Sequence, residues 1–132
     1  MKKLTKEQFH VLKEKGTEMP GTGKLLHNKK SGNYFCANCG NQIFSSENKF
    51  DSDVDGLRGW PSFSEAISDS VELKKDYSHN LDRIEIVCKN CNGHLGHLFD
   101  DYKSKTGKHF CVNSCVLDFK EKYKKPLNCK ET

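Results

Sequence analysis

The sequence has no apolar run long enough to span a membrane, and it has no internal repeat or low-complexity segment. Runs such as Ile84 to Cys88 fall far short of the roughly 20 apolar residues that a transmembrane helix needs. The basic N-terminus is not followed by the apolar segment of a secretory signal. These absences predict a soluble, cytoplasmic protein without a membrane partner.

Apolar residues are also scarce, since 34% of the 132 residues are hydrophobic and 30% are charged. This length fits one domain, and no break in composition marks a second. We therefore expect a single domain over residues 1–132, with its core at about 4–119 and a flexible lysine-rich tail at 120–132. A core with so few apolar side chains requires an additional crosslink.

The seven cysteines can supply that crosslink. They do not indicate a disulfide framework, because no export signal is present and the cytosol keeps structural thiols reduced. Four of them form two matched C-x-x-C turns, which together provide the closed tetrahedral shell of thiolates that structural zinc favours. We predict one structural Zn²⁺ per chain, bound by Cys36, Cys39, Cys88 and Cys91.

Short segments between turn-forming residues predict a β-rich fold after one N-terminal helix. The helix begins after Thr5, which forms a capping box with Gln8, and ends at Gly16. Proline and glycines in residues 17–23 predict an extended or turning arm. The expected strands include Tyr34–Cys36, Ile43–Phe44, Val71–Leu73, Arg83–Val87, Leu95–Phe99 and His109–Leu117.

Cys111 is the most promising nucleophile among the three cysteines that remain. On a strand it shares one face with His109 and Asn113, because side chains alternate between the two faces. Upstream, His94 and His97 lie next to two aspartates, and histidine is the side chain best suited to proton transfer near neutral pH. This combination predicts a thiol-based active site.

Several motifs in order resemble the B-type methionine sulfoxide reductases over roughly residues 4–119. They are Gly16-Thr17-Glu18 with Gly21-Thr22-Gly23, the two C-x-x-C turns, Phe50-Asp51-Ser52, Gly59-Trp60-Pro61-Ser62-Phe63, His94-Leu95-Gly96-His97-Leu98-Phe99-Asp100-Asp101 and Phe110-Cys111-Val112-Asn113-Ser114. The resemblance implies a mainly β fold of two packed antiparallel sheets with short N-terminal helices and a Cys₄ zinc site away from the active face. It also implies a monomer.

The resemblance further implies reduction of methionine-R-sulfoxide, free or in proteins, to methionine. Cys111 would attack the sulfoxide sulfur and be left as a sulfenic acid, which thioredoxin or a similar thiol reductant would regenerate. Proton donors are needed on the sulfoxide oxygen. The implied catalytic residues are Cys111, His94, His97, Asn113 and Asp101, with Asp101 orienting a histidine, and the implied substrate-binding residues are Trp60, Phe99 and His109.

The sequence departs from the family in its means of recycling Cys111. Many members carry a resolving cysteine shortly before the Trp-Pro motif, whereas this chain has no cysteine in residues 53–59. If residues 109–117 form one strand, Cys115 lies about 13 Å from Cys111, too far for a disulfide. Cys129 on the tail is a possible resolving cysteine, and direct reduction by an external thiol is an equal alternative.

His109 is a second departure, because this position is usually arginine in the family. A histidine lowers the pKa of Cys111 only while the histidine itself is protonated. We therefore expect activity to fall more steeply above neutral pH than in a His109→Arg variant.

A zinc-ribbon module that binds nucleic acid is the main alternative. Residues 40–101 hold 12 acids and 6 bases, and the remainder holds 6 acids and 16 bases, so the basic ends could contact phosphates. This alternative leaves Trp60, the paired histidines and Cys111 without a purpose. A zinc hydrolase that uses His94 and His97 would need a third protein ligand and an open position. We expect no nucleic-acid partner.

Overall fold

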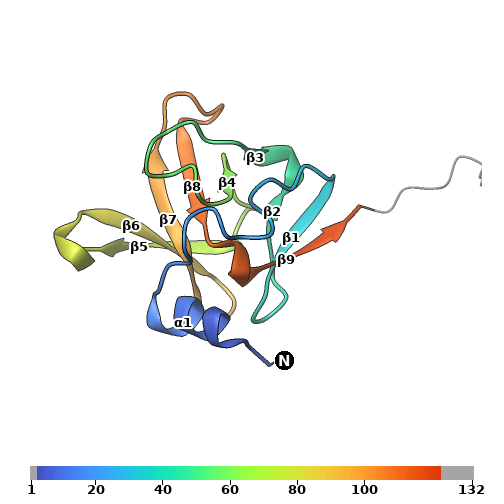
Figure 1. The fold of residues 1–132 in the computed structure, drawn as a ribbon, viewed down its shortest axis with the longest axis vertical. Helices are drawn as coiled ribbons and strands as arrows, with labels where there is room; N and C mark the ends of the chain where they lie inside the picture. The colour runs from blue at the N-terminus through green and yellow to red at the C-terminus, as the bar shows by residue number, and fades with distance from the viewer. Residues whose placement is uncertain (1–2, 123–132) are drawn as a thin grey trace, which may run out of the picture.

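The computed structural model describes residues 3–122, which form a mainly β fold (Figure 1). In this part of the chain no helix is both long enough and apolar enough to cross a membrane. The elements are α1 (Lys6–Glu14), β1 (Gly32–Cys36), β2 (Gln42–Ser45), η1 (Ser46–Asn48), β3 (Lys49–Phe50), β4 (Ser62–Phe63), β5 (Val71–Asp76), η2 (Ser78–Asn80), β6 (Arg83–Cys88), β7 (His94–Asp100), β8 (Lys108–Val112), η3 (Ser114–Val116) and β9 (Leu117–Glu121).

The helix α1 begins at the predicted capping box. The Thr5 side chain accepts the backbone N–H of Gln8 at 3.1 Å, and the Gln8 side chain accepts the backbone N–H of Thr5 at 2.9 Å. The helix ends at Lys15, which is left-handed with φ 58°. Where the resemblance implied several N-terminal helices, residues 3–122 contain this one α-helix and short 3₁₀ turns.

Two antiparallel sheets enclose the core, as expected. The smaller sheet has the order β2-β1-β9, and the larger has the order β3-β4-β8-β7-β6-β5. Aromatic rings join the sheets, since Phe44 of β2 stacks on Phe63 of β4 with ring centroids 4.1 Å apart. Tyr34 of β1 meets the same Phe63 ring edge-on at 5.0 Å. The hairpin of β5 and β6 extends beyond this core (Figure 1).

The expectation of one continuous strand over residues 109–117 is wrong. β8 ends at Val112, η3 turns the chain, and β9 joins the other sheet. Glu18 stabilises the turn, because its carboxylate accepts the backbone N–H groups of Ser114 at 2.7 Å and Cys115 at 3.0 Å. The turn that carries the chain from one sheet to the other is therefore held by Glu18 of the N-terminal arm.

Gly96 allows β7 and β8 to approach closely in the middle of the larger sheet. A Cβ atom at this position would collide with the backbone oxygen of Cys111 and with Val112. Glycine at this point therefore permits the strand pairing that places Cys111 opposite β7.

Candidate active site

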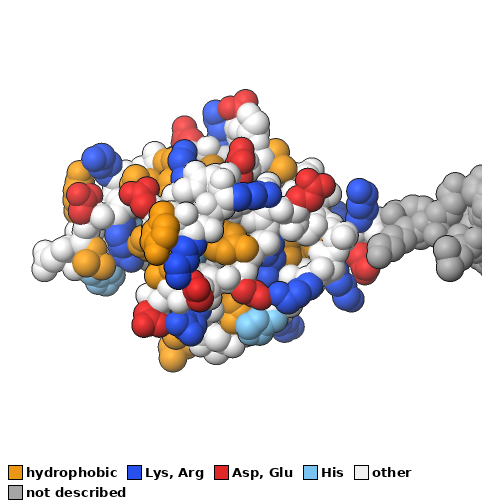
Figure 2. All heavy atoms as spheres, turned by 90° about the horizontal axis from the view of Figure 1, so that it is seen from above, with side chains coloured by type: hydrophobic (Ala, Val, Ile, Leu, Met, Phe, Trp, Pro, Cys, Tyr) orange, Lys and Arg blue, Asp and Glu red, His pale blue; other side chains and the backbone are white. Residues whose placement is uncertain are grey.

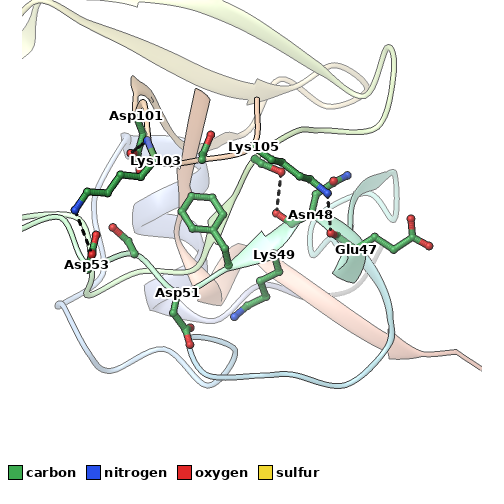
Figure 3. Close-up of a pocket in the computed structure, with 12 residues that line it drawn as sticks. Glu47, Asn48, Lys49, Asp51, Asp53, Asp101, Lys103 and Lys105 are labelled. Atoms are coloured by element: carbon green, nitrogen blue, oxygen red, sulfur yellow. Dashed lines mark hydrogen bonds and ion pairs between the residues drawn. The ribbon is translucent and has the colours of Figure 1, made fainter. Parts of the chain in front are cut away.

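Cys111 is half-buried on β8 and lines a cavity of about 110 Å³. The sequence predicted four of the other residues in its wall: Trp60, His97, Phe99 and Asn113. A larger hollow of about 440 Å³ lies elsewhere and is bordered by Asp53, Asp101 and Lys103 (Figure 3). We take the smaller cavity as the candidate active site, because Cys111, the predicted nucleophile, and an aromatic wall meet there.

The sheet arranges the site as a row of opposed residues. Across β6, β7, β8 and β4, Glu85 pairs with His97, His97 with Cys111, and Cys111 with Ser62. Directly opposed residues point to the same face of a sheet. The row therefore places a carboxylate, an imidazole, a thiol and a hydroxyl side by side.

His97 is held by a carboxylate that the sequence analysis did not identify. Its Nε2 lies 2.7 Å from Oδ2 of Asp76, which is 4% exposed. Burial lowers the pKa of His97, although the hydrogen bond with Asp76 opposes that shift. The same hydrogen bond holds the pKa of Asp76 well below its usual range. We therefore assign a neutral imidazole that donates Nε2–H to an ionised Asp76, which leaves Nδ1 as an acceptor.

His94 lies deeper and does not border the Cys111 cavity. Its Nδ1 is 2.8 Å from Oε2 of Glu85, and its ring meets the His97 ring edge-on at 5.2 Å. Among the described residues its Nε2 has no hydrogen-bond partner, and burial lowers its pKa. The geometry supports an indirect role for His94, through the position of His97.

Asp101 does orient a histidine, but it is His109. The Asp101 Oδ2 lies 3.0 Å from Nδ1 of His109, whose Nε2 lies 2.7 Å from the hydroxyl of Ser62. His109 is 0% exposed, packs against Phe50 and does not border the Cys111 cavity. We therefore do not retain His109 as a substrate-binding residue.

The same geometry revises the expected effect of His109 on the nucleophile. Burial lowers the pKa of His109, so the imidazole is neutral at neutral pH and supplies no positive charge to Cys111. Burial, and secondarily the charge of Glu18, raises the pKa of Cys111 to about 12. Cys111 therefore rests as a thiol, and any reaction through its sulfur requires removal of its proton.

Glu18 joins three parts of the site, and the sequence analysis had assigned it no role. Its backbone N–H donates to Oδ1 of Asn113 at 2.9 Å, and its backbone oxygen accepts Nε1–H of Trp60 at 3.0 Å. Asn113 also donates Nδ2–H to the backbone oxygen of Leu95 at 2.9 Å. The arm therefore fixes Trp60 and Asn113, which both border the Cys111 cavity.

Cys115 does not border the Cys111 cavity. Cys115 lines a different hollow of about 490 Å³, and burial together with Glu18 and Glu7 raises its pKa to about 12. Cys129 lies outside the described residues. Gly56 and Leu57, from the segment in which the resemblance led us to look for a resolving cysteine, border the Cys111 cavity.

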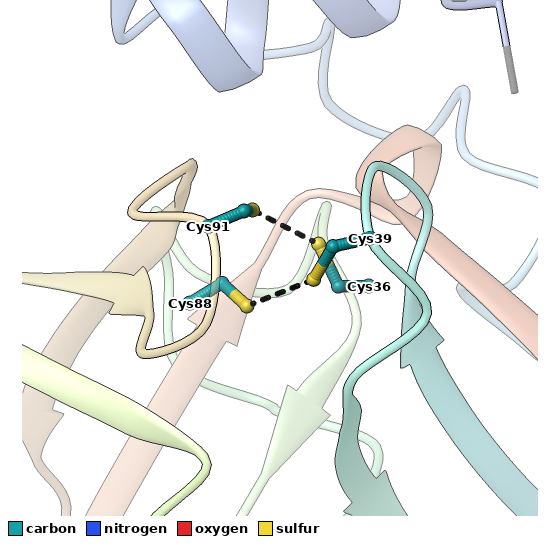
Figure 4. A group of neighbouring side chains, drawn as sticks. All are labelled: Cys36, Cys39, Cys88 and Cys91. Atoms are coloured by element: carbon teal, nitrogen blue, oxygen red, sulfur yellow. Dashed lines mark hydrogen bonds between the residues drawn. The ribbon is translucent and has the colours of Figure 1, made fainter. Parts of the chain in front are cut away.

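The four cysteines of the C-x-x-C turns converge as predicted (Figure 4). Sγ of Cys36 lies 3.7 Å from Sγ of Cys91, and Sγ of Cys39 lies 3.6 Å from Sγ of Cys88. A tetrahedral ion with metal–sulfur bonds of about 2.3 Å would place neighbouring sulfurs about 3.8 Å apart. The cluster can therefore hold a metal ion, and it connects the β1–β2 turn to the β6–β7 turn.

Three further charged residues support the site without having been predicted: Asp76, Glu85 and Arg83. The available signal was the alternation of charged and apolar residues in Arg83-Ile84-Glu85-Ile86-Val87, since charges on one face of a strand need partners. That signal does not name the partners, because the order of strands in the sheet is not visible in the sequence.

The surface does not favour the nucleic-acid alternative. On the face shown in Figure 2, basic and acidic side chains are interspersed. Lys29 pairs with Asp51 at 2.5 Å, and Lys103 pairs with Asp53 at 3.3 Å. A nucleic-acid footprint is expected to be a continuous basic patch.

Comparison with solved structures supports the fold alone. The "Yippee-like" domain of Mis18 aligns with a TM-score of 0.54 and 17% identity, covering 72% of this chain and 100% of that domain.

Comparison with known sequences identifies the family. The model of the SelR domain matches residues 4–121. The "Peptide methionine sulfoxide reductase MsrB" of Methanosarcina barkeri is 52% identical over 120 residues, which cover 90% of this chain and 82% of the relative. Proteins of the same name from Photorhabdus laumondii (51% identity; 89% of this chain and 85% of the relative) and Leptospira interrogans (46%; 91% and 89%) are also similar. With matches along nearly its whole length, the chain belongs to the SelR-domain family that includes the MsrB methionine sulfoxide reductases.

Proposed function

We propose that this protein reduces methionine-R-sulfoxide, free or within proteins, to methionine. The observation that carries the proposal is the cavity in which Cys111 faces Trp60, next to His97 in the adjacent strand. Membership in the SelR-domain family supports the same reaction.

Cys111 is the proposed nucleophile. Its sulfur attacks the sulfoxide sulfur, the sulfur–oxygen bond of the substrate breaks, and the oxygen is transferred to Cys111. The step converts one thiol and one sulfoxide into one sulfenic acid and one thioether, so it requires no further atom or electron. The proposed role of Trp60 is to pack its indole against the terminal methyl group; its position in the cavity wall and the bond of its ring nitrogen to the Glu18 backbone support this role.

His97 is the proposed proton carrier, because a thiol with a raised pKa needs a base at the moment of attack. His97 lies directly opposite Cys111, and its Nδ1 is free to accept while Nε2–H is bonded to Asp76. The imidazolium formed is stabilised by Asp76 and can pass the proton to the sulfoxide oxygen. Asn113 has one Nδ2–H left after its bond to Leu95, and this proton is suited to binding the same oxygen.

Zinc is the proposed occupant of the Cys36, Cys39, Cys88 and Cys91 cluster. The sulfur spacing and the four-thiolate donor set support this choice. Zinc would there stabilise the fold and leave no coordination position for substrate.

Regeneration of Cys111 requires two thiol equivalents: one condenses with the sulfenic acid and releases water, and a second reduces the resulting disulfide. Thioredoxin or a similar thiol protein is the proposed donor. Whether Cys129 provides the first thiol is tested by counting free thiols after one turnover in the wild type and in Cys129→Ser. Equal losses in both proteins would exclude Cys129.

We further propose a single-domain monomer that works in the cytoplasm. Cys111, Trp60, His97 and Asn113, the residues that the proposed reaction uses, border one cavity within a single chain, which supports this proposal. Cysteine-rich chains that rely on metal and free thiols suit a reducing compartment.

The decisive experiment supplies each methionine sulfoxide epimer separately with dithiothreitol and measures methionine by mass spectrometry. We expect turnover of the R epimer, loss of turnover in Cys111→Ser, and equal metal content in both proteins. Preference for the S epimer would contradict the proposal.

A further inference from the structure

Arg83 is a cation in the wall of the active-site cavity that the reaction described above does not use. It is the first residue of β6, and its side chain is 23% exposed. Residues that border the cavity include Leu57, Phe99 and Arg83, and none of the described lining residues is acidic. The cavity therefore presents one permanent positive charge.

The guanidinium group is only loosely engaged within the protein. Its Nη2 lies 3.4 Å from the Ser78 hydroxyl and 3.9 Å from Oδ2 of Asp76. That Asp76 oxygen already has a shorter contact, at 2.7 Å, with His97. Nε of Arg83 is buried and has no hydrogen-bond partner among the described residues. The exposed part of the side chain, 23% of its surface, is where the other guanidinium N–H groups can meet an acceptor on a ligand.

The position of Arg83 matches the main-chain end of a bound methionine sulfoxide. Ile84 pairs with Leu98, so Arg83 lies level with Phe99, two residues along the strand from the row of His97 and Cys111. Arg83 on β6 and Cys111 on β8 are two strand spacings apart and are offset by two residues along the strand direction. Their backbones are therefore separated by about 12 Å. The long arginine side chain spans part of that distance, and the substrate's own Cβ and Cγ span more of it.

Resting on the proposed function, we propose that Arg83 is a specificity-determining residue that binds the oxygen on the carboxyl side of the substrate's methionine unit. In a protein substrate this oxygen is a peptide carbonyl, and in the free amino acid it is a carboxylate. The sulfoxide oxygen is left to His97 and Asn113. Because arginine binds a carboxylate more strongly than a neutral carbonyl, Arg83 favours substrates with a free carboxylate or a C-terminal oxidised methionine.

The test compares N-acetyl-methionine-R-sulfoxide with its uncharged N-methylamide in the metal-loaded, full-length protein. The variants are Arg83→Met, Arg83→Lys and Lys75→Met. Lys75 is exposed on β5, and its pairing with Ile84 places it on the face of the hairpin opposite to Arg83. Lys75→Met therefore removes one positive charge, as Arg83→Met does, but away from the cavity. Circular dichroism and thermal unfolding establish that each variant is folded.

We expect Arg83→Met to lower kcat/KM for the carboxylate substrate by about tenfold or more, mainly through KM, and for the methylamide by about threefold or less. Arg83→Lys should recover part of the loss, and Lys75→Met should match the wild type. Equal losses on both substrates, or no loss on either, would overturn the inference about Arg83. Failure of the wild type to reduce either substrate would instead contradict the proposed function.

Discussion

Replacing Glu18 with glutamine tests the link between the N-terminal arm and Cys111. Glu18 is 4% exposed, and its carboxylate accepts two backbone N–H groups of η3 at 2.7 and 3.0 Å. Glutamine keeps one oxygen but turns an NH₂ group toward the second donor. Loss of one charge-assisted bond costs about 1.5–3 kcal/mol, part of which is offset because an amide is easier to bury than a carboxylate.

We expect a net loss of about 1–2 kcal/mol in the free energy of unfolding, which corresponds to a fall of about 4–8 °C in Tm for a domain of this size. The effect on Cys111 has the opposite sign. Glu18 is the smaller of two causes that raise the pKa of Cys111 to about 12 from an ordinary 9.0. The variant should therefore have a lower Cys111 pKa that is still above 9.0.

The assay measures alkylation of Cys111 by iodoacetamide at about pH 8.5 in a metal-loaded Cys115→Ser/Cys129→Ser background, together with thermal unfolding. A lower pKa increases the thiolate fraction, so Glu18→Gln should be alkylated several-fold faster although it is less stable. Glu65→Gln, at an exposed position, is the control for the loss of charge. If alkylation is no faster than in the wild type, or if Tm is unchanged, the proposed linkage is wrong.

Three other predictions follow from the same geometry. Asp76→Asn should lower kcat/KM by about 10- to 100-fold, because His97 loses its orienting carboxylate; an unchanged value in steady-state assays would contradict that role. Chelation of the metal, or Cys39→Ser, should lower Tm strongly, and calorimetry that finds no difference would contradict a structural metal. Burial lowers the pKa of His94, His97 and His109 in the folded protein from 6.5. Below about pH 6.5 the unfolded state therefore binds more protons than the folded state. As the pH is lowered through this range, the free energy of unfolding should fall by up to about 1.4 kcal/mol per pH unit for each histidine. Urea unfolding should show a shallower fall in His109→Gln, and an equal slope would argue against this origin.

Local signals predicted the parts of the molecule that depend on neighbouring residues. The capping box of Thr5 and Gln8 predicted the start of α1, and the two C-x-x-C turns predicted the four-cysteine cluster that can hold a metal ion. Cys111 and His97 were predicted from the residues around them, Trp60 came from a family motif, and the structure brings all three to one cavity. Each of these features depends on residues that are only a few positions apart, and such patterns can be read directly from the sequence.

The parts that could not be predicted depend on which strands lie side by side. Alternation correctly placed His109 on the face of Cys111, but it did not show that Ser62 and Asp101 would enclose the imidazole. Similarly, Asp76 holds His97 only because β5 and β7 both flank β6. The break after Val112 depends on Glu18, which lies more than 90 residues earlier, at a separation of 95 from Asn113.

Gly96 brings no functional group to the reaction, yet the position of Cys111 depends on it. Any side chain there would push against the backbone of Cys111 and widen the spacing between β7 and β8. The consequence is evolutionary: a change at position 96 would have to be accompanied by a rearrangement of the two central strands. Selection should therefore act on this glycine almost as strictly as on the nucleophile.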